Sequence, residues 1–339
     1  MRRVGIKIGL LVVVVAGLWM LWHRDRIHNL SDVFQLASEH WATVQSSLLG
    51  SSNNTEPDRN RDTILIASFN LRVTSDFGGP GYADERGERV RFHMVELFRL
   101  FDLIAIQGIG PDRSPDLIEW AHAANNDPYS QYSVVMSDLN ANDTSEERAA
   151  FVFNRARVQL DRAGVYSIAD PDGVFVRAPF VGCFRAVGPP TGQAFTFSLV
   201  NLEIDRRSPT GGLLSLREIV REVRRDGRNE DDVLLAGEFH TGDQGLEFLR
   251  RYGYVWVVSD TPTDTRYTTQ SANLLFDSRA TTEFIGRGGV LNLVKHFNVS
   301  LQEALAISEN VPVWGEFSVF EGYEMDPAKE VQAASFSTR

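Results

Sequence analysis

Residues 1–26 contain an uninterrupted apolar stretch. From Ile8 to Trp22 every residue is apolar or glycine, and residues 4–6 extend the run across a single charge at Lys7. At about 1.5 Å per residue, a helix over 4–22 nearly spans a hydrocarbon core of ~30 Å, and a lysine this close to one end can extend its ammonium group to the membrane surface. The pattern predicts an uncleaved transmembrane anchor over residues 1–26.

The flanking charges predict which side of the membrane the rest of the chain occupies. Arg2 and Arg3 precede the apolar run, which favours a cytoplasmic N-terminus and an extracytoplasmic domain. Arg24 and Arg26 follow the run and oppose this orientation. A cleaved signal peptide is the alternative to an anchor, but no small-x-small cleavage site follows the run. We therefore expect a single-pass membrane protein.

A second apolar pattern follows the predicted anchor. Apolar side chains recur at spacings of three and four between residues 34 and 48, which predicts an amphipathic juxtamembrane helix over 27–49. This helix could pack on the domain, lie on the membrane surface or pair with a second copy of itself. Residues 50–62 are polar and contain glycine and proline, which indicates a linker. The apolar positions of the stripe are Phe34, Ala37, Trp41, Val44 and Leu48.

Short apolar runs, separated by helices and loops, occupy residues 63–322. Apolar side chains at helical spacing predict helices within 90–101 and 216–223. Strands outnumber helices and do not alternate regularly with them, which favours an α+β domain over a doubly wound sheet. We expect a four-layer α/β/β/α sandwich of two packed mixed sheets, followed by a flexible tail over 323–339. The predicted strands lie at 64–69, 103–106, 149–153, 195–200, 233–236, 274–276 and 313–317.

Composition and charge narrow the classes of partner. The 339 residues include 45 Asp and Glu against 34 Lys and Arg, a formal net charge of −11 at pH 7. This charge argues against non-specific attraction to nucleic acid, which needs clustered basic residues, but it does not exclude a local basic cleft. The single cysteine, Cys183, excludes an intramolecular disulfide, and its strand-like context predicts a small buried residue.

Polar residues follow the ends of the predicted strands in a fixed order. The segments that carry this order are SFNLR at 68–72, AIQGI at 105–109, ERAAFVF at 147–153, VRAPF at 176–180, LVNLE at 199–203, GEFH at 237–240, SANL at 271–274 and SENVPV at 308–313. Their order resembles the endonuclease/exonuclease/phosphatase superfamily, which includes deoxyribonuclease I. The resemblance covers residues 63–322 and implies the superfamily's sandwich fold and its metal-dependent hydrolysis of phosphoesters.

The resemblance also implies a catalytic set, and this chain departs from it at most positions. In the superfamily an Asn, a Glu and a closing Asp hold magnesium, one His activates water and a second His steadies the phosphoryl group. Here Gly108 stands at the Glu position and Glu309 at the closing Asp, while Glu203 and Asn310 replace the two histidines and Ala272 replaces an orienting Asp. Loss of such a set removes the standard mechanism. We therefore expect a pseudoenzyme that acts by ligand or protein binding.

A rewired phosphodiesterase or nuclease is the alternative, with magnesium or manganese bound by the remaining acidic and imidazole groups. If Glu147 and Glu203 face each other, either the pKa of one of them is raised or a cation or Arg148 lies between them. A purely structural ectodomain that dimerises through the stripe is a third class. The candidate partners are the membrane and a phosphate-bearing ligand or protein. The candidate site residues are Glu147, Glu203 and His240 for catalysis, Arg177 and Asn310 for substrate binding, and Asn70, Glu238 and Glu309 for metal binding.

Overall fold

The computed structural model describes residues 57, 60–72, 85–126, 130–139 and 146–322, all within one compact unit, Ser51–Arg339. The predicted anchor over 1–26, the juxtamembrane helix over 27–49 and the tail over 323–339 lie outside the described residues, as does most of the predicted linker. None of the helices in the described part of the chain is both long enough and apolar enough to cross a bilayer.

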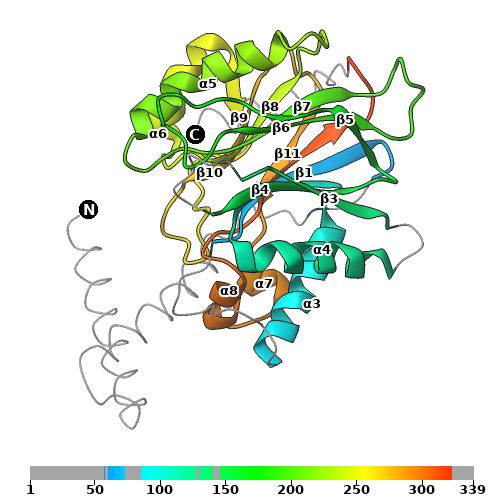
Figure 1. Ribbon diagram of the computed structural model, residues 1–339, viewed down its shortest axis with the longest axis vertical. Helices are drawn as coiled ribbons and strands as arrows, with labels where there is room; N and C mark the ends of the chain where they lie inside the picture. Colours follow the sequence, from blue (N-terminus) through cyan, green and yellow to red (C-terminus); the bar gives the residue numbers. More distant parts are fainter. Residues whose placement is uncertain (1–56, 58–59, 73–84, 127–129, 140–145, 323–339) are drawn as a thin grey trace, which may run out of the picture. The chain divides into compact units, whose positions relative to one another are not determined.

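Two six-stranded sheets form the centre of the domain (Figure 1). The first sheet has the strand order β11-β12-β1-β2-β4-β3, and the second has the order β5-β6-β7-β8-β10-β9. The strands of the first are β1 (Thr63–Asn70), β2 (Leu103–Ile109), β3 (Tyr132–Met136), β4 (Arg148–Asn154), β11 (Phe284–Val290) and β12 (Val313–Ser318). Those of the second are β5 (Val158–Ser167), β6 (Phe180–Ala186), β7 (Thr196–Glu203), β8 (Val233–Glu238), β9 (Tyr254–Trp256) and β10 (Ala272–Asp277).

The two sheets share one pairing pattern. Each has a single parallel pair at its centre, β1 with β2 and β7 with β8, flanked on both sides by antiparallel strands. A parallel pair needs a crossover, and helices supply it here: α3 (Glu85–Leu100) joins β1 to β2, and α5 (Pro209–Arg224) joins β7 to β8. In each sheet the carboxyl ends of two neighbouring strands therefore lie at the same edge.

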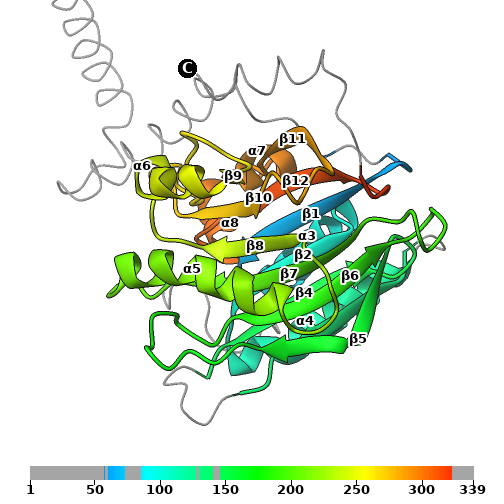
Figure 2. The same ribbon diagram turned by 90° about the horizontal axis from the view of Figure 1, so that it is seen from above.

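Helices cover the outer face of each sheet, and Figures 1 and 2 show the resulting layers. The first sheet packs on α3, α4 (Ser114–Ala123), α7 (Leu293–Phe297) and α8 (Leu301–Ile307), and the second packs on α5 and α6 (Asp243–Leu246). The 3₁₀ helices of the described residues are η2 (Pro111–Arg113), η3 (Ala124–Asn126) and η4 (Glu247–Tyr252). The predicted sandwich of two packed mixed sheets with helices is confirmed.

A layer of aromatic rings fills the space between the two sheets. Phe151 and Phe180 stack across it with their ring centroids 5.0 Å apart, and further phenylalanines extend the layer on both sides. Along β1 the side chains alternate, so that Ile64 and Ile66 face this layer while Leu65 packs toward the helices. Because both faces of the central strands are covered, these strands are apolar throughout, which is why their sequences predicted strands so clearly.

Candidate functional site

The carboxyl ends of the central strands of both sheets meet at one edge of the sandwich. Gln107 near the end of β2 donates from Nε2 to Oδ1 of Asn201 near the end of β7, at 2.7 Å. Asn201 in turn donates from Nδ2 to the carbonyls of Ile106 and Ala150, at 2.8 and 3.0 Å. All four residues are buried. This amide pair fixes the two sheets against each other directly beneath the candidate site.

Asn70 ends β1 and is buried, but its side-chain oxygen is already engaged by its own chain. Oδ1 accepts from the backbone N–H of Arg72 at 3.0 Å, and the Asn70 carbonyl accepts from the hydroxyl of Ser308 at 2.6 Å. Gly108 lies next to this turn with φ +68°, and a Cβ there would approach Asn70 Oδ1 to 2.5 Å. Asn70 therefore shapes the turn that leads into Arg72.

The centre of the site is a network of charged side chains from both sheets. Glu203, fully buried at the end of β7, has one carboxylate oxygen 3.0 Å from Nη2 of Arg72 and the other 3.6 Å from Nη1 of Arg177. The same two arginines contact Glu147, Arg177 at 2.5 Å and Arg72 at 3.6 Å. The cations between Glu147 and Glu203 are therefore the guanidinium groups of Arg72 and Arg177. Arg148 instead donates to the Ser137 carbonyl.

The positive groups around Glu203 keep it ionised in spite of its burial. Burial by itself raises the pKa of Glu203, but the nearby His240 imidazole and the charges of Arg72 and Arg177 outweigh it, so the pKa lies below its usual value. Burial tends to lower the pKa of Arg72, and the surrounding glutamates more than compensate, so that its pKa is raised. Both groups are therefore charged at neutral pH, and each stabilises the other.

His240 and Glu238 extend the network from the end of β8. The imidazole Nε2 lies 3.7 Å from Glu203 and Nδ1 lies 3.9 Å from Glu238, so both ring nitrogens face carboxylates. His240 has φ +50°, a left-handed conformation that is unusual for a non-glycine residue. Glu238 is buried and accepts from the hydroxyl of Ser271 at 2.5 Å, and burial raises its pKa. We call Arg72, Glu147, Arg177, Glu203, Glu238 and His240 the charge cluster.

Glu309 and Asn310 approach this edge through their backbone. The Glu309 N–H donates to the Arg72 carbonyl at 3.0 Å, and the Asn310 N–H donates to the Ser308 hydroxyl at 2.9 Å. Both side chains are half-buried, and within the described residues no hydrogen bond or ion pair joins either of them to the charge cluster. The structure therefore brings Glu147, Arg177, Glu203, Glu238 and His240 into one network, and places Asn70, Glu309 and Asn310 beside it.

Several functional contacts were not predicted from the sequence. Arg72 belongs to the segment SFNLR but had no role assigned, and the Ser271 hydroxyl that binds Glu238 was likewise passed over. Asp243, at the start of α6, accepts from Trp256 Nε1 at 2.9 Å and from the Asp260 N–H at 2.8 Å, so it holds a loop. A basic residue two positions after a strand-end Asn was the one signal available for Arg72.

The donor set does not fit the magnesium ion that the resemblance implies. Magnesium requires near-octahedral oxygen ligands, with one or two carboxylates. Gly108 offers no side chain, the Asn70 oxygen is engaged by a backbone N–H, and the Glu203 carboxylate is matched by arginines. Across the described residues, three or more His, Cys, Asp or Glu side chains bring ligand atoms within 4.8 Å of one another in two groups, and neither contains a residue of the charge cluster.

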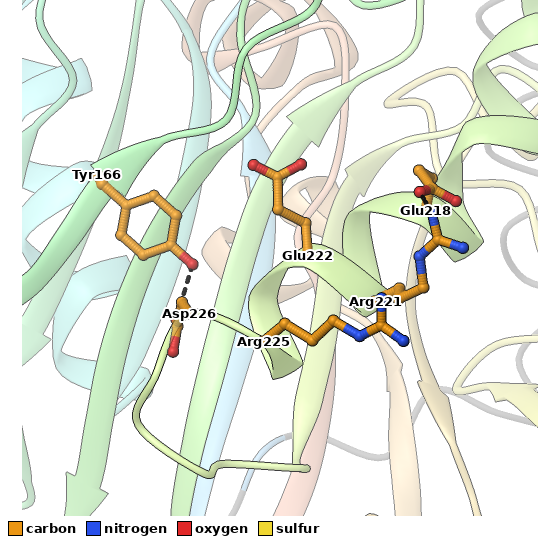
Figure 3. A pocket seen from close by; sticks show the side chains of 6 residues that line it. All are labelled: Tyr166, Glu218, Arg221, Glu222, Arg225 and Asp226. Carbon is orange, nitrogen blue, oxygen red and sulfur yellow. Dashed lines mark hydrogen bonds and ion pairs between the residues drawn. The ribbon is translucent and has the colours of Figure 1, made fainter.

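A separate surface cavity of about 390 Å³ lies over α5 (Figure 3). It is lined by charges of both signs, and several are already paired: the Tyr166 hydroxyl donates to Asp226 at 2.9 Å, and Arg221 pairs with Glu218. The lining residues are Tyr166, Glu218, Arg221, Glu222, Arg225 and Asp226, none of them in the charge cluster.

Comparison of the sequence with known proteins finds deoxyribonucleases. The chain is 26% identical over 198 residues to deoxyribonuclease-1-like 1 of Sus scrofa, an alignment that covers 55% of this chain and 61% of the relative. It is 24% identical over 269 residues to deoxyribonuclease gamma of Rattus norvegicus, covering 74% and 83% respectively. The chain thus spans about three fifths of the first of these relatives. No protein-family model matches the chain.

Comparison of the fold finds solved structures of the same architecture. A family protein from Bacteroides thetaiotaomicron, described as an endonuclease/exonuclease/phosphatase, superposes with a TM-score of 0.52 at 17% identity, covering 78% of this chain and 96% of that one. A mannosyl-6-phosphatase from the same organism gives a TM-score of 0.50 at 18% identity, covering 74% and 98%. At such identities the likeness shows the fold alone.

Proposed function

Because the chain is a distant member of the deoxyribonuclease I-like endonuclease/exonuclease/phosphatase superfamily, we propose that its domain keeps the phosphoesterase scaffold as a binding domain without the metal-dependent chemistry. One observation carries the proposal. The guanidinium group of Arg72 lies 3.0 Å from the buried Glu203 and 3.6 Å from Glu147. A fixed cation therefore neutralises the carboxylates on which a metal-assisted or general-base mechanism would depend.

The same arrangement leaves one exposed face for a ligand. Arg72 is 31% exposed and Glu147 is 27% exposed, whereas Arg177 and Glu203 are buried behind them. An anionic ligand can reach Arg72 and compete with Glu147 for it, and a phosphate group suits a guanidinium because it accepts two parallel hydrogen bonds. We therefore propose a phosphate-bearing ligand, contacted by Arg72 in front of Arg177, with Asn310 as a candidate neighbour.

The test of the proposal is a hydrolysis assay on the full-length protein in detergent. Double-stranded DNA is the first substrate, because the relatives are named deoxyribonucleases, and RNA, a simple phosphodiester and an inositol phosphate complete the panel. We expect no difference between buffer with magnesium or manganese and buffer with chelator. Metal-dependent turnover that disappears in Glu238→Gln would reject the proposal.

Binding is measured separately with a fluorescent oligonucleotide at low salt. We expect Arg72→Met to weaken binding by roughly tenfold, which corresponds to one lost charge-assisted contact. Arg91→Met is the matched control, because Arg91 forms an exposed ion pair with Glu119 on the surface between α3 and α4. Equal affinity for the wild type and Arg72→Met would remove Arg72 from the ligand site.

A second candidate function is a hydrolase with a rewired site, and His240 is the observation that favours it. Its imidazole lies between Glu203 and Glu238, as an oriented general base would. Against this, both ring nitrogens face carboxylates of the protein, so neither is directed at a water molecule. Turnover in the assay above, lost in His240→Gln as well as in Glu238→Gln, would support this candidate over the binding domain.

Membrane attachment forms part of the proposal and rests on the apolar run at 8–22. We propose that residues 1–26 tether the domain to a membrane, with the domain on the extracytoplasmic side. The full-length protein should remain in the membrane pellet after a carbonate wash, and a variant that lacks residues 1–26 should appear in the supernatant. A full-length protein released by carbonate would contradict the anchor.

A further inference from the structure

A second group of acidic side chains gathers at the end of the sandwich opposite the charge cluster. Asp232 immediately precedes β8, whose other end carries Glu238. At about 3.3 Å per residue the strand separates these two residues by roughly 20 Å. Glu283 immediately precedes β11, and Glu321 follows β12 by three residues. Three strand ends from both sheets therefore contribute one carboxylate each to the same place.

The three carboxylates are close enough to share one ion. Asp232, Glu283 and Glu321 each place an oxygen within 4.8 Å of the others, and Asp232 forms a second such group with the adjacent Glu230 and Asp231. Asp232 and Glu283 are each only 1% exposed, whereas Glu321 faces solvent. The group is thus a buried pair of carboxylates with a third at its opening.

The buried oxygens of this group lack partners, and this second observation points to a ligand. Within the described residues, Oδ1 of Asp232 and Oε2 of Glu283 are buried without any hydrogen-bond donor. The neighbouring Thr281 hydroxyl is also buried and lies beside Asp232. A buried carboxylate oxygen without a donor is strongly unfavourable, so such atoms call for a cation.

The remaining oxygens are held in place by backbone groups. Oε1 of Glu283 accepts from the Gly322 N–H at 2.7 Å, and Oε2 of Glu321 accepts from the Thr196 N–H at 3.1 Å. These contacts leave one oxygen of each side chain free to turn toward the shared centre. The backbone at the start of β7 and in the segment after β12 therefore positions Glu321 and Glu283, as ligands of a bound ion generally are positioned.

No basic side chain neutralises the group in the described part of the chain. None of the ion pairs there includes Glu230, Asp231, Asp232, Glu283 or Glu321. Burial, together with the charges of Glu283, Glu230 and Glu321, raises the pKa of Asp232 to about 8 against the opposing hydrogen bond from the Thr281 hydroxyl. The charge cluster has its own arginines, and this group has only like charges around it.

We propose that Asp232, Glu283 and Glu321 form a divalent-cation site that binds calcium, with the Thr281 hydroxyl beside it. All the donors are hard oxygens, which excludes the softer metals, and calcium accepts an irregular set of six to eight oxygens, including water, more readily than magnesium does. The bound ion would join β8 of one sheet to β11 and β12 of the other. Its role would be to clamp the two sheets at the end remote from the charge cluster.

The experiment is a calcium titration of the full-length protein in detergent, after removal of divalent ions with a chelator. We expect calcium to raise the melting temperature by about 5–10 °C at a hundredfold excess over its dissociation constant. Glu321→Gln should weaken the calcium response by roughly tenfold or more without affecting the fold, because Glu321 is exposed. Asp232→Asn should abolish the response, because it replaces one ligand oxygen of the buried pair with an amide nitrogen.

Glu119→Gln serves as the control, because Glu119 is an exposed carboxylate on α4. Its melting temperature should rise with calcium as in the wild type. A wild-type protein whose melting temperature does not respond to calcium would overturn the site, and so would an undiminished response in both Glu321→Gln and Asp232→Asn. A larger response to magnesium or manganese than to calcium would overturn the choice of calcium. The outcome is independent of whether the charge cluster hydrolyses phosphoesters.

Discussion

Arg72, two residues beyond the end of β1, reaches across from the first sheet to place its Nη2 3.0 Å from the carboxylate of Glu203 at the end of β7 in the second. The contact joins the two sheets at the edge where the carboxyl ends of their central strands meet. A buried carboxylate requires a counter-charge, and here the counter-charge is covalently part of the chain. The same arginine thereby links the stability of the domain to the chemistry of the site.

Arg72→Met tests this link through stability. Removal of the guanidinium group leaves Glu203 with Arg177 as its remaining arginine, so the variant should lose about 2 kcal/mol of unfolding free energy at neutral pH, less than a fully buried pair because Arg72 is partly exposed. Urea unfolding of the full-length protein measures the change. Arg91→Met, which breaks an exposed pair, should stay within about 0.5 kcal/mol of the wild type. Equal losses in the two variants would contradict a special role for Arg72.

The pH dependence of stability should depend on Glu203. Its pKa in the folded protein lies below the ordinary value of 4.5, because His240, Arg72 and Arg177 outweigh the effect of burial. A carboxylate with a lowered pKa stabilises the fold above its unfolded pKa, and this contribution is lost as the pH falls through the folded value. Glu203→Gln should therefore be less stable than the wild type at pH 7, and the gap should narrow below pH 4.5.

Urea midpoints recorded between neutral and acidic pH would reveal this convergence. The exposed Glu88 on α3 provides the matched control, since Glu88→Gln should differ little from the wild type at any pH. A stability gap for Glu203→Gln that stays constant down to strong acid would show that Glu203 acts through packing and not through its charge.

A side chain at Gly108, the position where the resemblance implies a metal-binding Glu, should strain the turn at Asn70. The φ of Gly108, +68°, is unfavourable for any residue with a Cβ, and that Cβ would lie 2.5 Å from Asn70 Oδ1. We expect Gly108→Ala to lose about 2 kcal/mol, of which roughly 1 kcal/mol is backbone strain. Gly110→Ala should be neutral or slightly stabilising, because Gly110 has φ −66° and open space around it. A stable Gly108→Ala would mean that the turn at Asn70 adapts.

The sequence predicted the central strands well and the outer strands poorly, for physical reasons. β1 and β8 are buried on both faces and are therefore continuous apolar runs. β5 lies at a sheet edge with exposed polar residues, and a register shift between Asp161 and Tyr166 interrupts its alternation, so no strand was predicted there. β11 contains three glycines and a register shift of its own, and it was missed for the same reason.

The sequence could predict those residues of the candidate site that lie at strand ends. Glu203 and Glu238 are register partners across β7 and β8, so their proximity follows from the parallel pair alone. The position of the Arg72 guanidinium does not, because a long side chain beyond a strand end can extend in several directions, and only the burial of Glu203 in the other sheet selects one. Sequence reasoning therefore predicted the carboxylates, and a cation between Glu147 and Glu203, but it did not identify Arg72 as that cation.

The buried pair of Gln107 and Asn201 beneath the site predicts which of two substitutions loses more unfolding free energy. Asn201→Leu leaves the carbonyls of Ile106 and Ala150 without their side-chain donor and removes the shortest of the three contacts of the Gln107 amide, so it should lose about 3–4 kcal/mol. Gln107→Leu should lose less, about 1–2 kcal/mol. The side-chain oxygen of Gln107 is buried without a hydrogen-bond donor, so its removal also removes an unfavourable buried polar atom.

Urea unfolding of both variants beside the wild type gives the order directly. The two side chains have no charge, so the order should hold at pH 5 and at pH 8, unlike the effect of Glu203→Gln. The larger loss in Asn201→Leu identifies Asn201 as the residue that holds the sheets in register under the charge cluster, because it alone contacts two strands of the opposite sheet, β2 and β4. A reversed order would assign that role to Gln107, and the cluster above would then depend on β2 for its geometry.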